Sequence, residues 1–117
     1  MLKEQIEKIA ELSGDFNPLH VDEEYAKDTK FEKPICHGMM LASFFSRLVG
    51  MHIPGKNSLY MSQSLKFFSP CYSGEHIIVE GIVNAKSNAT KIITIETNIF
   101  KNNKKIITGE AKVMVRK

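Results

Sequence analysis

Three polar side chains with complementary chemistry lie within six residues of one another near the N-terminus. Asp15, Asn17 and His20 supply a carboxylate, a carboxamide and an imidazole, within the sequence Gly-Asp-Phe-Asn-Pro-Leu-His of residues 14–20. Pro18 lacks an N–H and disfavours helix at Asn17, so this segment is predicted to be a bent loop. Such a loop could bind a small reactant and move protons, because Asp and His are common acid–base groups.

A second motif, Pro-Ile-Cys-His-Gly-Met-Met at residues 34–40, opens a strongly apolar segment. Gly38 is expected to begin a helix over residues 38–49, and Gly50 to end it. The first N–H groups of a helix have no partner within it and favour negative charge, and glycine lets a ligand approach them closely. Together the two motifs indicate an enzyme that acts on a carbonyl-containing substrate.

The composition is that of a small globular protein with a single domain over residues 1–117. No apolar run is long enough to cross a bilayer, and the N-terminus lacks the apolar core of a signal peptide. The net charge of +3 gives no case for nucleic-acid binding. We therefore expect a cytoplasmic protein that binds neither nucleic acid nor membranes.

Neither the cysteines nor the polar loop predicts a metal site or covalent catalysis. Cys36 and Cys71 are far apart in the sequence, and a disulfide is not expected in the cytoplasm. The loop does not fit an EF-hand, since His20 stands where glycine is needed and Ala26 where a bidentate Glu is needed. Cys36 has no evident base partner, and His37 is expected to be structural. No metal and no cofactor are predicted.

Hydrophobic periodicity predicts helices in the first part of the chain and strands in the second. The helix over residues 38–49 carries large apolar residues on nearly every side, so it is predicted to be wholly buried. The small residues Gly109 and Ala111 would let a helix pack closely on the last strand. These features predict an α+β fold in which an antiparallel sheet wraps a central helix. Two further helices are predicted, over residues 2–12 and 23–26, and Asp22 would cap the second of them. Pro34 would also allow the long helix to start early. Strands are predicted over residues 59–68, 77–86, 91–100 and 105–115, with a hairpin turn at Asn102-Asn103 between the last two.

These motifs resemble those of (R)-specific enoyl-CoA hydratases, the MaoC-like dehydratases. Residues 14–20 are similar to the hydratase-2 signature of that family, and residues 34–43 are similar to its second conserved block. Residues 54–60 and 63–67 look like a third block, and Pro70, Gly74 and Glu75 fit the turn that follows. The resemblance covers nearly the whole chain, in order and at the family's spacing.

The resemblance implies the hot-dog fold, a homodimer, and acyl-thioester sites near the subunit interface. It implies that Asp15 and His20 are catalytic and hold one water, that the Gly38 N–H stabilises the enolate oxygen, and that Asn17 supports the site. Which of Asp15 and His20 takes the first proton is left open. Family members often begin with a strand before the first helix, whereas this sequence begins with the helix, so the sheet is expected to be one strand short and the dimer interface to compensate.

The implied reaction is reversible syn addition of water to trans-2-enoyl thioesters, giving (R)-3-hydroxyacyl thioesters, in fatty acid metabolism. Two alternatives remain at this stage. A hot-dog acyl-CoA thioesterase often carries a carboxylate on the central helix, and residues 38–49 contain none. A catalytically silent hot-dog module would not need the Asp15/His20 pair. The sequence does not determine the acyl chain length, the physiological direction, or whether the carrier is coenzyme A or acyl carrier protein. It also leaves open whether the chain forms a homodimer or a higher homo-oligomer.

Overall fold

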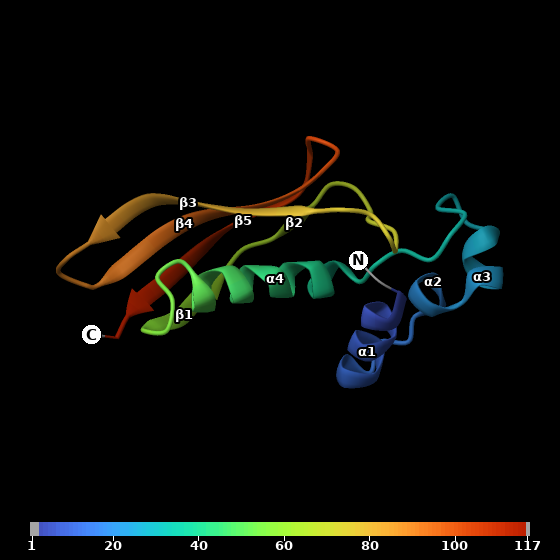
Figure 1. The fold of residues 1–117 in the computed structure, drawn as a ribbon, viewed down its shortest axis with the longest axis horizontal. Helices are drawn as coiled ribbons and strands as arrows, with labels where there is room; N and C mark the ends of the chain where they lie inside the picture. The colour runs from blue at the N-terminus through green and yellow to red at the C-terminus, as the bar shows by residue number, and fades with distance from the viewer. Residues whose placement is uncertain (1–2, 117) are drawn as a thin grey trace.

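The computed structural model describes residues 3–116, in which four helices precede five strands (Figure 1). The α+β class predicted from the sequence is confirmed. The elements are α1 (Lys3–Ser13), α2 (Pro18–Val21), α3 (Glu23–Lys27), α4 (Gly38–Met51), β1 (Ser58–Gln63), β2 (Lys66–Phe67), β3 (Ile78–Ser87), β4 (Ile92–Lys101) and β5 (Lys104–Val115).

The strands form one antiparallel sheet in the order β1-β5-β4-β3, with β2 also paired to β5. The hairpin between β4 and β5 turns at Asn102 and Asn103, whose φ angles are 52° and 63°. Asparagine is one of the few residues with a side chain that adopts positive φ readily, which is why Asn and Gly dominate such turns. The predicted hairpin is confirmed.

Helix α4 lies along one face of this sheet, and the core fills the space between them (Figure 1). Leu41 and Phe45 pack in one cluster with Ile99 and Ile107 of the sheet. Val49 packs further along with a second cluster, which consists of Ile95, Ala111 and Val113. The sheet therefore covers α4 along its length, as the hot-dog arrangement requires.

The prediction that α4 is wholly buried is wrong for the single chain. Met39 and Met51 keep 68% and 70% of their surface exposed, and Ser43, Ser46 and Arg47 are exposed as well. A sheet on one side can cover only one side of a helix. The apolar residues of α4 therefore outnumber the positions that this sheet can bury.

The ends of α4 also differ from the expectation. The helix does not start near Pro34, because Ile35 forms an antiparallel bridge with Tyr72 instead. Gly50 does not stop it either; the helix continues to Met51 and His52 caps it, with the His52 N–H bonded to the Leu48 carbonyl. Its beginning at Gly38 is confirmed.

The strand predicted over residues 59–68 is broken between β1 and β2. At the break, the Ser64 N–H donates to the Glu110 carbonyl, and the Ser64 carbonyl oxygen lies directly over Gly109. A Cβ at Gly109 would overlap that oxygen. Gly109 therefore admits a crossing strand segment, not a helix as expected.

The three short N-terminal helices gather at one end of the molecule, beyond the first turn of α4 (Figure 1). The predicted helix over residues 2–12 is confirmed as α1, apart from its first residue, which lies outside the described range. Asp22 caps α3 as expected, with its Oδ1 accepting from the Tyr25 N–H at 3.1 Å. No helix within residues 3–116 is long and apolar enough to cross a membrane.

Candidate active site

A run of local hydrogen bonds shapes the loop that follows α1. Gly14 adopts a φ of +80°, which favours glycine, and its N–H donates to the Ala10 carbonyl at the end of the helix. The Ser13 hydroxyl then accepts from the Asp15 N–H at 3.1 Å. These contacts turn the chain out of α1 and fix the backbone where Asp15 begins.

Asn17 connects this loop to the helix that carries His20. Asp15 Oδ1 accepts from the Asn17 N–H at 3.2 Å, and Asn17 Oδ1 accepts from the Leu19 N–H at 3.0 Å. Asn17 is thus the N-cap of α2, and Pro18 at the first helical position needs no hydrogen-bond acceptor. Asn17 therefore orders the backbone between Asp15 and His20.

The hydrogen bonding of His20 determines which of its ring nitrogens is available. Nδ1 lies 2.7 Å from the Ile35 carbonyl oxygen. A carbonyl oxygen only accepts, so Nδ1 carries the proton and donates. In the neutral ring, Nε2 is then the nitrogen with a free lone pair, which suits it to accept a proton.

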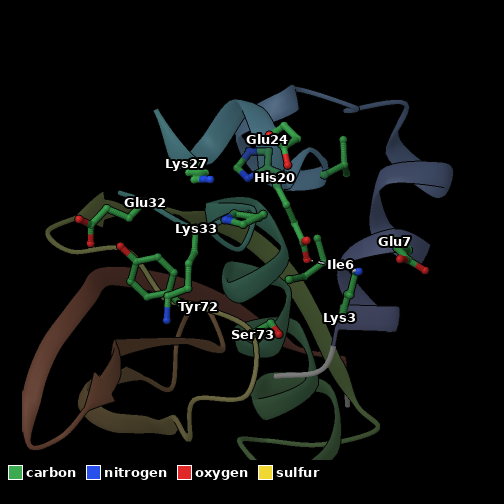
Figure 2. Close-up of a pocket in the computed structure, with 13 residues that line it drawn as sticks. Lys3, Ile6, Glu7, His20, Glu24, Lys27, Glu32, Lys33, Tyr72 and Ser73 are labelled. Atoms are coloured by element: carbon green, nitrogen blue, oxygen red, sulfur yellow. Dashed lines mark ion pairs between the residues drawn. The ribbon is translucent and has the colours of Figure 1, made fainter. Parts of the chain in front are cut away.

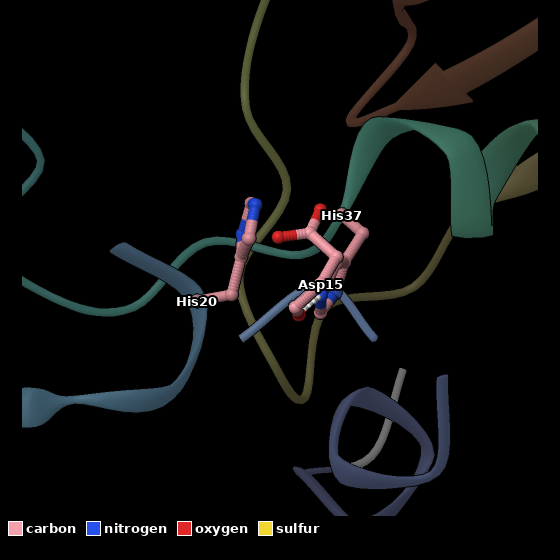
Figure 3. A group of neighbouring side chains, drawn as sticks. All are labelled: Asp15, His20 and His37. Carbon is pink, nitrogen blue, oxygen red and sulfur yellow. Dashed lines mark hydrogen bonds between the residues drawn. The ribbon is translucent and has the colours of Figure 1, made fainter. Parts of the chain in front are cut away.

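Asp15 and His20 meet a third side chain, His37, at the beginning of α4 (Figure 3). A carboxylate oxygen of Asp15 and one ring nitrogen of each histidine all lie within 4.8 Å of one another. The pairing of Asp15 with His20 that the sequence suggested is therefore present in space. The proximity of His37 was not anticipated, and its position next to Gly38 in the second motif was the only available signal.

The stacked rings make this trio a poor metal site. His20 and His37 lie face to face, with centroids 4.0 Å apart and planes 23° from parallel. Their in-plane lone pairs therefore run side by side, whereas a tetrahedral zinc site requires them to converge on one ion. The geometry suits acid–base chemistry better than metal coordination.

Asp15, His20 and Gly38 line a common pocket of about 450 Å³. The rest of its wall is mostly apolar and consists of Ile9, Ser13, His37, Met39, Met40 and Phe67. A second pocket of about 440 Å³ shares His20, Gly38 and Phe67 with the first and extends over Leu41 and Ile107. Polar groups thus converge where two largely apolar hollows meet, an arrangement typical of sites for small organic ligands.

Gly38 is the first residue of α4, so its N–H is one of those that a helix cannot satisfy internally. A Cβ at this position would lie 2.7 Å from the ring of Phe67. Glycine therefore lets Phe67 pack against the start of the helix. The three predicted site residues, Asp15, His20 and Gly38, are brought together.

A further pocket of about 460 Å³ also has His20 in its wall (Figure 2). Its wall carries three lysines, Lys3, Lys27 and Lys33, and four glutamates, Glu7, Glu23, Glu24 and Glu32. Neither Asp15 nor Gly38 lines it. Its mixed charge and the missing acid–base partner make it a weaker candidate for the reaction than the pocket that contains Asp15.

Cys36 and Cys71 face each other as buried free thiols beside the site. The Cys36 N–H donates to the Cys71 carbonyl at 2.8 Å. The hydrogen bond between the two thiols, together with burial, raises the pKa of Cys36 far above its usual value. A thiol that stays protonated is a poor nucleophile, so Cys36 is not suited to covalent catalysis.

Comparison with known proteins identifies the family. A family model described as MaoC like domain matches residues 1–105. The (R)-specific enoyl-CoA hydratase of Aeromonas caviae is 46% identical over 110 residues, which are 93% of this chain and 82% of that protein. This chain belongs to the MaoC-like dehydratase family.

Two further similarities to members or structures of the MaoC-like family support this assignment. The mitochondrial 3-hydroxyacyl-(acyl-carrier-protein) dehydratase of Arabidopsis thaliana is 40% identical over 116 residues, which are 96% of this chain and 69% of that protein. The solved structure of the (R)-hydratase from A. caviae matches with a TM-score of 0.95 at 43% identity, over 98% of this chain and 88% of that one. The predicted hot-dog fold is therefore confirmed.

Proposed function

We propose that this protein is a hydro-lyase that adds water reversibly to trans-2-enoyl thioesters and produces (R)-3-hydroxyacyl thioesters. The observation that carries the proposal is the convergence of Asp15, His20 and Gly38 on one pocket. The names of its relatives, an (R)-specific enoyl-CoA hydratase and a 3-hydroxyacyl-(acyl-carrier-protein) dehydratase, support the same reaction in its two directions. They also name both carriers, so the proposal covers the thioester of either one.

The proposed reaction uses Asp15 and His20 to hold one water. The Asp15 carboxylate and the Nε2 lone pair of His20 are both acceptors, so a single water can donate one hydrogen to each. Its oxygen bonds to C3 of the substrate as one of the two groups takes a proton, and a proton from the pair reaches C2. Because the two groups lie within 4.8 Å of each other and act on one water, oxygen and proton arrive on the same face of the double bond.

Gly38 is proposed to stabilise the negative charge that the thioester oxygen acquires between these steps. Its N–H lies at the first position of α4, where the helix dipole favours negative charge. A donor that is already in place need not reorganise as the charge develops, and such donors make large contributions to catalysis. The shared pocket lets one substrate reach the Gly38 N–H and the Asp15/His20 pair together.

The test is to incubate the purified protein with crotonyl-CoA and follow three quantities. We expect loss of the conjugated enoyl thioester, formation of (R)-3-hydroxybutyryl-CoA, and no release of free thiol. Free thiol that appears faster than hydration would indicate a thioesterase. An (S) product would contradict the proposed stereochemistry. If neither crotonyl-CoA nor its carrier-protein thioester is hydrated, the proposed function is excluded.

We also propose that the protein is a homodimer. The exposed side of α4 carries Met39 and Met51, and strand β3 lies at a sheet edge with Ile78, Ile82 and Val83 exposed. Unpaired edges and apolar faces of this kind favour association with a second copy.

Sedimentation at assay concentrations is expected to give twice the mass of one chain. Ile82→Asp, on the exposed edge, should shift the protein toward monomer and lower activity, because an interface cannot bury the new charge without cost. Leu12→Asp provides the control, since Leu12 is also an exposed apolar residue but lies on α1. A stable monomer with full activity would contradict the dimer.

A further inference from the structure

His37 is buried at the first turn of α4, but it does not behave like a core residue. Only 4% of its surface is exposed. It occupies the N-cap position of α4, yet its side chain makes no capping hydrogen bond. Instead, its ring reaches back to the loop that carries Asp15 (Figure 3).

The first contact of the ring holds the Asp15 backbone. His37 Nε2 lies 2.9 Å from the Asp15 carbonyl oxygen, across 22 positions of sequence. Because that oxygen can only accept, Nε2 carries the proton and donates. This bond ties the loop to the start of α4, the same place at which Gly38 presents its N–H.

The second contact holds the ring of His20. The two imidazoles stack with centroids 4.0 Å apart. His20 is thereby restrained on its edge, by the bond from Nδ1 to the Ile35 carbonyl, and on its face, by His37. Both restraints come from the same short segment, residues 35–37, so one stretch of backbone sets the orientation of the imidazole.

The remaining nitrogen of His37 argues against a purely structural role. With Nε2 protonated, Nδ1 is an acceptor, and among the described residues it is the buried side-chain atom without a hydrogen-bond partner. A buried acceptor without a hydrogen bond lowers the stability of the folded protein. A flat apolar side chain of similar shape would not carry this cost. Orphaned groups of this kind are tolerated where function requires the residue.

We infer that His37 is a positioning residue for the hydration reaction: it fixes the Asp15 backbone and the His20 ring so that both groups address the same water. The inference rests on the proposed function for its chemistry. It changes the interpretation of His37 from the sequence, where the residue was expected to be structural.

Two conservative variants separate the two contacts. His37→Gln keeps an N–H donor near the position of Nε2 and loses the ring, whereas His37→Phe keeps a flat ring and loses the donor.

His37→Ala loses both contacts and is expected to lower kcat by about 10²-fold, the usual scale for misplaced catalytic groups. Gln and Phe should fall between alanine and wild type, with KM changed less than about 2-fold because the pocket wall is otherwise intact. Ile106→Val, a change to a fully buried residue outside the pocket, is the control for lost stability alone.

The decisive measurement adds His37→Ala to a His20→Ala background. In that background the stack on His20 is gone and only the contact with the Asp15 backbone remains. The second substitution should therefore reduce kcat less than it does in the wild-type protein. An undiminished, multiplicative loss in that background would overturn the inference, and so would wild-type kcat in both His37→Gln and His37→Phe.

A readout that does not depend on activity separates this inference from the proposed function. Nitrogen NMR of the His20 ring should show a proton on Nδ1 in the wild type, and in His37→Phe and His37→Gln a ring that is more mobile or divided between tautomers. If the His37 variants change the His20 signals but the wild type shows no hydration, the proposed function fails while His37 still orients the His20 ring. Unchanged His20 signals in every folded His37 variant would refute the positioning role.

Discussion

Replacing His20 with alanine is expected to lower kcat for enoyl-thioester hydration by about 10²–10⁴-fold, the usual contribution of a positioned proton-transfer group. Asp15→Asn should cause a loss of the same order, because the carboxamide presents an N–H where the water needs an acceptor. Both side chains lie on the loop and short helix between α1 and α3, outside the apolar core, so the melting temperature should change little. Steady-state kinetics with crotonyl-CoA and thermal melts of each variant check both statements.

The double variant tests whether the two residues act together. If Asp15 and His20 hold one water, removing the second group after the first should cost much less than the product of the single effects. His76→Ala and Asp28→Asn are matched controls, since both residues are exposed and line neither of the two pockets that meet at Gly38. Turnover close to wild type in either single variant, at an unchanged melting temperature, would show that the residue only shapes the loop.

The second large effect is expected for Gly38→Pro, which removes the proposed donor while keeping the helix. Proline is well tolerated at the first helical position, and the residue before it must be extended. His37 already meets that requirement, with φ −61° and ψ 128°. Loss of the N–H should lower kcat by about 10²–10³-fold, as for other oxyanion donors.

Gly38→Ala is the control that isolates the N–H from the added bulk. Both variants introduce a Cβ close to the ring of Phe67, which is about half exposed and can move aside. Only proline also loses the donor, so the ratio of kcat between the alanine and proline variants reports the hydrogen bond. Circular dichroism would verify that α4 remains intact. Equal kcat in the two variants would show that the Gly38 N–H does not stabilise the transition state.

Much of this protein could be predicted from sequence because the deciding interactions are local. Pro18 and Asn17 determine a capped turn within a few residues, and the Asn102-Asn103 turn needs only residues that accept positive φ. The start of α4 at Gly38 follows from the apolar run that comes after it. The two motifs also carried the family resemblance, and with it the fold, which the comparisons confirmed.

The errors lie where the outcome depends on distant parts of the chain. Gly109 was expected to admit a helix, but the group above it is the Ser64 carbonyl, brought there by strand pairing across 45 positions of sequence. The burial of α4 was overestimated because a periodic pattern shows which faces are apolar, and only the tertiary structure decides which of them the sheet covers.

The sequence by itself determined which chemical groups are present, and the tertiary structure alone decided how they are oriented. Asp15 and His20 were identifiable from their motif, but the available nitrogen of His20 depends on a carbonyl at Ile35. The involvement of His37 likewise depends on a bond to Asp15 and a stack on His20 that no local pattern encodes. The physical reason is that hydrogen bonds and ring contacts act over a few ångströms, so their partners are known only once the chain has folded.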